Sequence, residues 1–120
     1  MPDPKPILFA PAPDDNPALV ARIVRGHNLG LIRDGWLVYY YDLSTLPATI
    51  DDDTLYVAKT VDGRNVIRRL KRGRVPGAYD MFTATGPVEL DVKLEWAQAI
   101  VWIRPHKLTD DQWAQLGVVT

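Results

Sequence analysis

Residues 24–36, VRGHNLGLIRDGW, have the layout of a catalytic loop, with a tight turn at each end and a strand expected on either side. The second turn is Asp34–Gly35, a pair that favours turns. The candidate cleft residues of this loop are Gly26, His27 and Leu29. Serine, threonine and cysteine, which attack acyl groups when a neighbouring base activates them, are absent from the stretch. Acyl-transfer chemistry would therefore need groups from elsewhere in the chain.

His27 and Asn28 also have a purely structural interpretation. Asparagine tolerates the left-handed backbone conformation that tight turns require, so the pair can simply shape the loop, and we favour that interpretation over a binding role. A metal site is not expected, because His27 and His106 lie far apart in the sequence and neither has partners at the spacing of a zinc site. We also expect no cofactor.

Composition excludes several classes of protein. The 120 residues include 14 basic and 15 acidic side chains, so the chain as a whole lacks the positive charge of a dedicated nucleic-acid-binding protein. There is no cysteine, which excludes disulfides, thiolate metal sites and cysteine nucleophiles. No apolar run approaches the roughly 20 residues of a membrane span, and the N-terminus lacks the pattern of a signal peptide. We expect a soluble cytoplasmic protein without membrane contact.

The chain divides into an N-terminal arm and one β-rich domain. Six of the ten prolines fall within residues 1–17, which are predicted to be a linker or arm because proline withholds a backbone donor and favours extended chain. Residues 18–120 form the predicted domain. Short runs rich in β-branched and aromatic residues predict strands at 18–25, 36–42, 54–60, 65–71, 79–84 and 96–104.

The clearest turn is Asp62–Gly63, which lies between two of these predicted strands. A two-residue Asp-Gly loop favours a type I′ hairpin. In that register Val57 faces Arg68 and Lys59 faces Val66. Lys59 and Arg68 then project from the same face of the sheet.

One helix is predicted over residues 108–117. Thr109 is the predicted N-cap, Gln112 completes a capping box, and acidic residues occupy the first turn. Trp113 and Leu116 lie on one face, and Gly117 ends the helix. The fold class predicted from all these elements is mainly β with a short C-terminal helix.

The strongest charge feature is RNVIRRLKRGR, residues 64–74, with six basic residues in eleven. Such a run could contact phosphates, with nearby aromatic side chains stacking on bases. A cationic edge strand also discourages aggregation between strands, and Asp51, Asp52 and Asp53 could neutralise part of the charge. We favour this second interpretation, in which the aromatic residues fill the core and the chain does not contact nucleic acid directly.

The predicted strand at 96–104 is apolar on both faces. Trp96, Ile100 and Trp102 share one face with Gln98, whereas the other face carries alanine, valine and isoleucine. A strand that covers only one side of a core alternates with polar residues, so the surplus face needs a second cover. The terminal helix, the proline-rich arm or another subunit could supply it. We predict a two-fold dimer through this strand.

The order of these elements resembles the C-terminal domain of LexA-type and phage-type repressors, over about residues 18–105. Three blocks carry the resemblance: VRGHNLGLIRDGWLVYY, TLYVAKTVDGRNVIRRLKRG and WAQAIVWIRP. In that family the first block typically contains Gly-Asp-Ser-Met followed by Asp-Gly-Asp, and the second ends in Val-Lys-Arg-Leu. Here the corresponding segments are GHNL (26–29), DGW (34–36) and IRRL (67–70). The resemblance implies the fold that also serves signal peptidases.

In the family the serine attacks a peptide bond in the linker of the same chain, and a deprotonated lysine is the general base. Asn28 lies at the serine position and Arg68 at the lysine position. The lone pair of an amide nitrogen is delocalised, and arginine stays protonated near pH 7, so neither residue can perform its counterpart's step. The family's usual Ala-Gly and Cys-Gly cleavage sites are also missing.

Lys59 is the best substitute base, because a guanidinium on the same face favours the neutral amine. Ser44 is the hydroxyl nearest to the loop in sequence, but it is better explained as a turn residue. A residual self-cleaving peptidase with a substitute base is therefore an alternative that we do not favour.

We interpret the chain as a catalytically inactive LexA-like domain that serves as a dimerisation or protein-interaction module in transcriptional regulation. The expected partners are a second copy, another protein, or a helix-turn-helix domain fused elsewhere in the gene product. The alternative from a different class is a stand-alone domain that binds a ligand or a regulator in the vacated cleft. That cleft would include Gly26, His27, Leu29 and Lys59.

Overall fold

The computed structural model describes residues 16–26, 30, 32–105 and 117–119. This described part contains strands and no helix, which confirms the prediction of a mainly β fold. The strands are β1 (Leu19–Val24), β2 (Leu37–Tyr41), β3 (Leu55–Thr60), β4 (Asn65–Arg72), β5 (Ala78–Phe82), β6 (Glu89–Ala99), β7 (Trp102–Arg104) and β8 (Gly117–Val119). Of the proline-rich arm, only Asn16 and Pro17 lie within the described residues.

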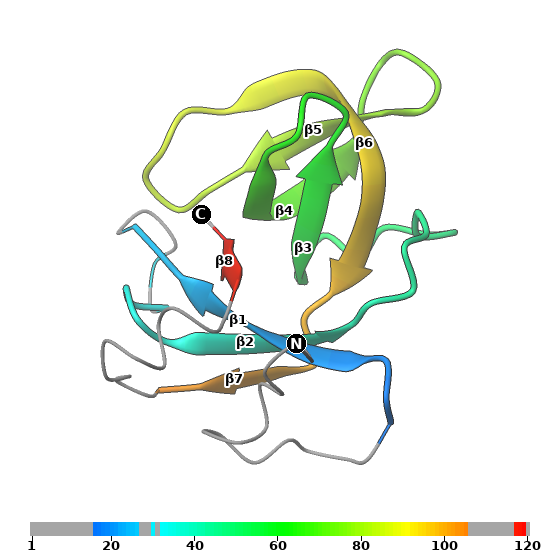
Figure 1. Cartoon of the computed structure of the whole chain (residues 1–120). Helices are drawn as coiled ribbons and strands as arrows, with labels where there is room; N and C mark the ends of the chain where they lie inside the picture. The colour runs from blue at the N-terminus through cyan, green and yellow to red at the C-terminus, as the bar shows by residue number, and fades with distance from the viewer. Residues whose placement is uncertain (1–15, 27–29, 31, 106–116, 120) are drawn as a thin grey trace.

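The strands form two groups (Figure 1). One is a four-stranded sheet in the order β7-β2-β1-β8, and the other is a closed barrel of β3, β4, β5 and β6. Neighbouring strands are antiparallel except β8, which runs parallel to β1. The long strand β6 curves down one side of the barrel and leads into β7, so that it connects the two groups (Figure 1).

The strand predicted at 96–104 is wrong as a single element. It breaks at Ile100 and Val101, with β6 before the break in the barrel and β7 after it in the other sheet. At the break, the Ile100 N–H donates to the Leu55 carbonyl at 2.9 Å, and the Val101 N–H donates to the Tyr39 carbonyl at 2.9 Å. At these two bonds the chain stops pairing with β3 of the barrel and begins to pair with β2 of the other sheet. The other five predicted strands are confirmed within two residues at each end.

The predicted hairpin between β3 and β4 is correct, but its loop and register are wrong by one residue. Tyr56 lies opposite Arg68, and Lys59 lies opposite Asn65. The loop has three residues and ends at Gly63, whose φ of 95° suits glycine and whose N–H donates to the Thr60 carbonyl at 3.0 Å. A one-residue shift moves every side chain to the other face of a strand, so Lys59 and Arg68 lie on opposite faces.

The predicted C-terminal helix lies outside the described residues except at its end. Gly117, predicted to stop the helix, begins β8 and lies opposite Arg22 of β1. Residues 108–116, with Thr109, Gln112, Trp113 and Leu116, are among those not described.

Among the residues that the structure describes, buried apolar side chains form three clusters. One fills the barrel and draws on all four of its strands, with Tyr56, Leu70, Tyr79 and Met81 among its members. The second lies between the barrel and the other sheet, where the rings of Tyr40 and Trp96 stack with centroids 5.7 Å apart. The third contains residues on the opposite face of β1 and β2. Because Tyr39, Tyr40, Tyr56 and Tyr79 are all buried, the prediction that aromatic residues fill the core is confirmed for them.

Candidate functional site

The loop that resembles a catalytic loop is closed at its base by Asp34. The Asp34 carboxylate accepts a hydrogen bond from the Gly26 N–H at 3.0 Å and lies 3.6 Å from the Arg25 guanidinium. The Asp34–Gly35 turn is confirmed, with a φ of 90° at Gly35. The three residues at the centre of the motif, His27, Asn28 and Leu29, lie outside the described residues. The predicted roles of these three residues therefore stay predictions.

Arg68, at the family's lysine position, lies half-buried on the face of β4 that lines the barrel core. Its neighbours on that face, Val66 and Leu70, belong to the core cluster. Its Nη1 donates to the carbonyl of Ile67 at 2.8 Å. Burial lowers the pKa of Arg68, and the Glu89 carboxylate acts in the opposite direction. Arg68, which is hydrogen-bonded to a carbonyl and influenced by the Glu89 carboxylate, keeps its positive charge and cannot act as a base.

The described end of the loop lies near the segment that follows β5. A Cβ built at Gly30 would lie 3.5 Å from the Cβ of Ala84. Phe82, which ends β5, lies opposite Arg69 of β4. The loop and the β4 strand thus share one neighbour, the segment from Phe82 to Ala84.

Lys59, predicted to be the best substitute base, is separated from Arg68 by the sheet itself. Its partner on β4 is Asn65, which places it on the opposite face from Arg68. Its Nζ lies 3.6 Å from Oε2 of Glu95, and 38% of its side chain is exposed. The predicted activation of Lys59 by a guanidinium on the same face is therefore wrong. Ser44, in contrast, lies between strands, with a φ of 53° and a hydrogen bond from its hydroxyl to Asp42.

The basic run 64–74 is bound largely within the molecule. Arg64 makes two hydrogen bonds to Glu89, at 2.9 and 3.2 Å. Arg72 donates to the Ala48 carbonyl at 2.8 Å, and Arg74 lies 3.9 Å from the Asp91 carboxylate.

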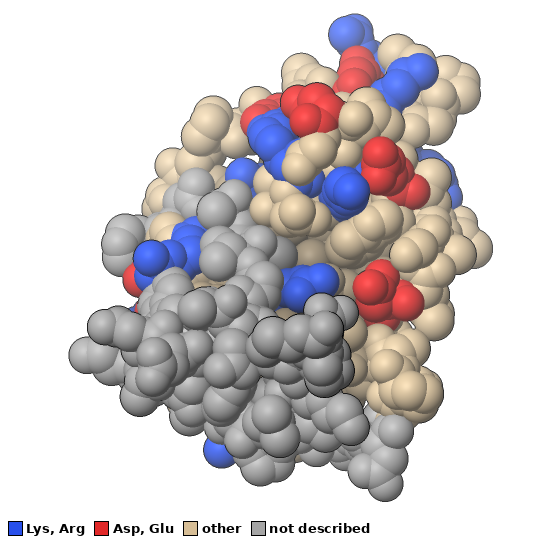
Figure 2. All heavy atoms as spheres, viewed as in Figure 1, with Lys and Arg blue, Asp and Glu red and all other residues tan. Residues whose placement is uncertain are grey.

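Lys71 and Arg69 of this run also contact groups of the chain itself. Lys71 lies over the ring of Phe82, with 5.6 Å from Nζ to the ring centroid. Arg69 donates two hydrogen bonds to the backbone carbonyl of Asp52. It also lies 4.0 Å from the carboxylate of Asp53, one of the three aspartates predicted to neutralise part of the charge. Figure 2 shows lysine and arginine interspersed with aspartate and glutamate over the barrel half of this face.

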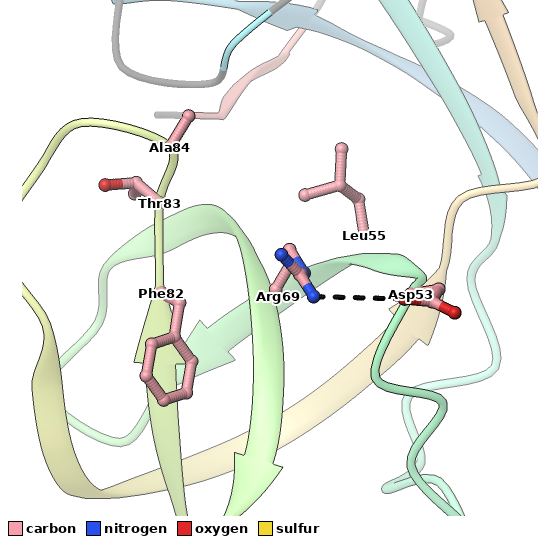
Figure 3. A pocket seen from close by; sticks show the side chains of 6 residues that line it. All are labelled: Asp53, Leu55, Arg69, Phe82, Thr83 and Ala84. Atoms are coloured by element: carbon pink, nitrogen blue, oxygen red, sulfur yellow. Dashed lines mark ion pairs between the residues drawn. The ribbon is translucent and has the colours of Figure 1, made fainter.

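A pocket of about 340 Å³ opens beside Arg69 (Figure 3). It is lined by Asp53, Leu55, Arg69, Phe82, Thr83 and Ala84. None of these belonged to the cleft predicted from the sequence. The sequence predicts only that Asp53, with its two neighbouring aspartates, neutralises part of the basic run that contains Arg69, and it carries no signal that these two residues border a cavity.

The three residues proposed for a dimer strand do not share one face. Trp96 and Ile100 pack at the margin of the core between the barrel and the sheet. Trp102 lies opposite Tyr39 of β2, whose side chain belongs to the cluster on the far face of that sheet. Trp102 is 46% exposed on the edge strand β7, between the exposed side chains of Val101 and Ile103.

Within the described residues, no cluster of histidine, aspartate or glutamate could hold a metal ion. The same residues include no helix with the length and apolar character needed to cross a membrane. Comparison of the chain with protein families, with curated proteins and with solved structures found no match in any of the three.

Proposed function

We propose that this chain is a cytoplasmic LexA-like domain that lacks peptidase activity and associates with protein partners, first of all with a second copy of itself, in transcriptional regulation. The proposal rests on the three sequence blocks that resemble the repressor family. It is supported by the antiparallel β3–β4 hairpin that carries Arg68, and by the approach of Gly30, at the described end of the loop, to Ala84.

The absence of peptidase activity is supported most directly by the placement of Lys59 and Arg68. A nucleophile and its base must come within hydrogen-bond distance, so a substitute base would have to reach the side of the sheet that Arg68 occupies. Lys59 lies on the other side and is close to Glu95. Arg68 itself keeps its proton near pH 7. Loss of even one member of a nucleophile–base unit costs on the order of 10⁴ to 10⁶ in rate.

The association role is supported by the edge strand β7. Val101, Trp102 and Ile103 are each more than a third exposed, and among the described strands β7 pairs with β2 alone. An edge strand with free backbone groups and apolar side chains is a template for pairing with another chain. Two β7 edges related by a two-fold axis would present the same surface to each other. A fused helix-turn-helix domain or another protein would complete the regulator.

Mass spectrometry of the purified chain after several days at pH 10 tests the loss of peptidase activity. We expect one intact species, even though an ordinary lysine is partly neutral at that pH. The variant carrying Asn28→Ser and Arg68→Lys is expected to restore little cleavage, because the chain has no Ala-Gly bond. A discrete fragment from the wild-type chain with a terminus within residues 1–20, abolished by Lys59→Ala, would refute the proposal.

A further inference from the structure

We propose that the pocket beside Arg69 binds a free α-amino acid with an apolar side chain. This inference goes beyond the proposed function, and it does not depend on dimerisation or on the vacated catalytic positions. It rests on a cation, an anion and apolar walls that border one small cavity (Figure 3).

The first observation is the pairing of opposite charges at the pocket. Nη2 of Arg69 lies 4.0 Å from Oδ1 of Asp53, and both residues line the cavity. An α-amino acid carries its ammonium and its carboxylate on adjacent bonds of one carbon, so its binding site needs an anion and a cation side by side. A simple carboxylate ligand would be repelled by Asp53, and a simple amine would be repelled by Arg69. A zwitterion satisfies both charges.

The second observation is that the guanidinium is held in a fixed orientation. Nε and Nη2 of Arg69 both donate to the carbonyl oxygen of Asp52, at 3.0 and 2.8 Å. A guanidinium has five N–H groups, so these two bonds leave donors for a carboxylate in the planar arrangement that carboxylates prefer. Asp53, in contrast, has a side chain that is 98% exposed, so it can turn toward an ammonium group.

The third observation concerns the walls and the size of the cavity. Figure 3 shows Arg69 between Asp53 on one side and the Phe82–Ala84 segment on the other, with Leu55 beside it. Thr83 accepts a hydrogen bond from the Gly86 N–H at 2.6 Å, so its hydroxyl is engaged within the chain. Leu55, Phe82 and Ala84 supply the apolar part of the lining. A volume of about 340 Å³ is near the lower limit for small-molecule sites, as a single amino acid requires.

Titration of the ¹⁵N-labelled full chain with L-phenylalanine and L-leucine tests the proposal. We expect saturable shifts at the amides of Thr83 and Ala84. Three probes each lack one feature: 3-phenylpropionate has no ammonium, 2-phenylethylamine has no carboxylate, and glycine has no apolar side chain. Each is expected to bind at least about ten-fold more weakly, since one charge-assisted hydrogen bond or a buried side chain is worth about that factor.

Variants identify the charged residues. Arg69→Gln and Asp53→Asn are each expected to weaken binding of L-phenylalanine by about ten-fold or more. Arg72→Gln is the matched control, because Arg72 also lies on β4 and donates to a loop carbonyl, that of Ala48, but does not line the pocket. Asp53→Asn alters an exposed side chain, so it remains informative if Arg69→Gln is unstable.

The proposal is overturned if neither amino acid gives saturable shifts up to about 10 mM, a concentration that would detect even a weak millimolar site. It is also overturned if 2-phenylethylamine or 3-phenylpropionate binds as tightly as L-phenylalanine, or if Arg72→Gln weakens binding as much as Asp53→Asn does.

Discussion

Arg64 and Glu89 form a two-pronged ion pair, with Nη1 2.9 Å from Oε1 and Nη2 3.2 Å from Oε2. Arg64 directly precedes β4, and Glu89 begins β6. These two strands are not neighbours in the barrel, because each pairs with β3 and β5. The pair therefore links opposite sides of the barrel that backbone hydrogen bonds do not join.

This ion pair predicts a specific dependence of stability on pH. Hydrogen bonds from Arg64, and to a lesser extent the charges of Arg64 and Arg68, lower the pKa of Glu89 from its ordinary value of 4.5. A lowered pKa in the folded state contributes stability that is complete above the pKa of the unfolded state. That stability is lost as the pH falls through the folded pKa. We therefore expect the contribution to decline progressively below about pH 4.5.

Thermal unfolding of the wild type and of Glu89→Gln at pH 7 and pH 3 measures this contribution. At pH 7 the variant is expected to be less stable by about 0.5–1 kcal/mol, as for a partly exposed bidentate pair. At pH 3 the difference shrinks. Glu95→Gln is the control, since Glu95 has a single 3.6 Å contact with an exposed lysine. A difference that is the same at both pH values would show that the ion pair is not its source.

The three-residue loop of the β3–β4 hairpin predicts the effect of changing Gly63. A Cβ at this position would meet no atom within 4 Å, so only the φ of 95° opposes a side chain. We expect Gly63→Ala to lower the free energy of unfolding by about 1–2 kcal/mol, the usual cost of placing an L-residue in the left-handed region. Gly63→Asn is expected to cost less, because asparagine tolerates that region better. Chemical denaturation measures both, and equal costs for the two variants would contradict the loop geometry.

The same hairpin shows where sequence patterns predict a fold and where they do not. Strands such as β1 and β2 follow from runs of β-branched and aromatic residues, and their predicted bounds are nearly correct. Val61 misled the prediction of the loop, because an apolar residue before Asp62 resembles the end of a strand, whereas it lies in the turn. That single residue reversed the predicted faces of Lys59 and Arg68.

The strand β6 was missed over its first part and extended too far at its end. Leu90, Val92 and Leu94 alternate with charged residues, a pattern that predicts a strand, but the prediction began only at Trp96. At the other end the apolar pattern continues unbroken through Ile100 and Val101. Only the tertiary hydrogen bonds to Leu55 and Tyr39 decide that the chain changes sheets there.

The pocket could not be predicted from sequence for a related reason. Its lining comes from the Asp53 loop with the start of β3, from β4, and from the end of β5 with the two residues after it. The distance between Arg69 and Asp53 depends on the bonds that tie the guanidinium to the Asp52 carbonyl. No local pattern encodes such a contact between side chains 16 positions apart in the numbering.

The internal binding of the basic run predicts weak affinity for nucleic acid. Arg64 and Arg69 are both bound to groups of the chain itself, and acidic residues lie among the cations. We expect binding to duplex DNA to be detectable only at low salt and to be lost by about 200 mM, as for a few nonspecific phosphate contacts. Fluorescence anisotropy with an unrelated and a palindromic duplex measures this. A complex that distinguishes the two duplexes and survives that salt concentration would favour a direct nucleic-acid role.

The central claim, that the chain is an association module, is tested most directly by sedimentation equilibrium at micromolar concentrations. We predict an average mass that rises with concentration from 13.5 kDa toward twice that value. Trp102→Glu is expected to abolish the rise, because it places a charge on the exposed β7 edge, whereas Val61→Glu, at an exposed position in the hairpin loop, is expected to leave it unchanged. A mass of 13.5 kDa that stays constant over a ten-fold range of concentration would contradict the claim.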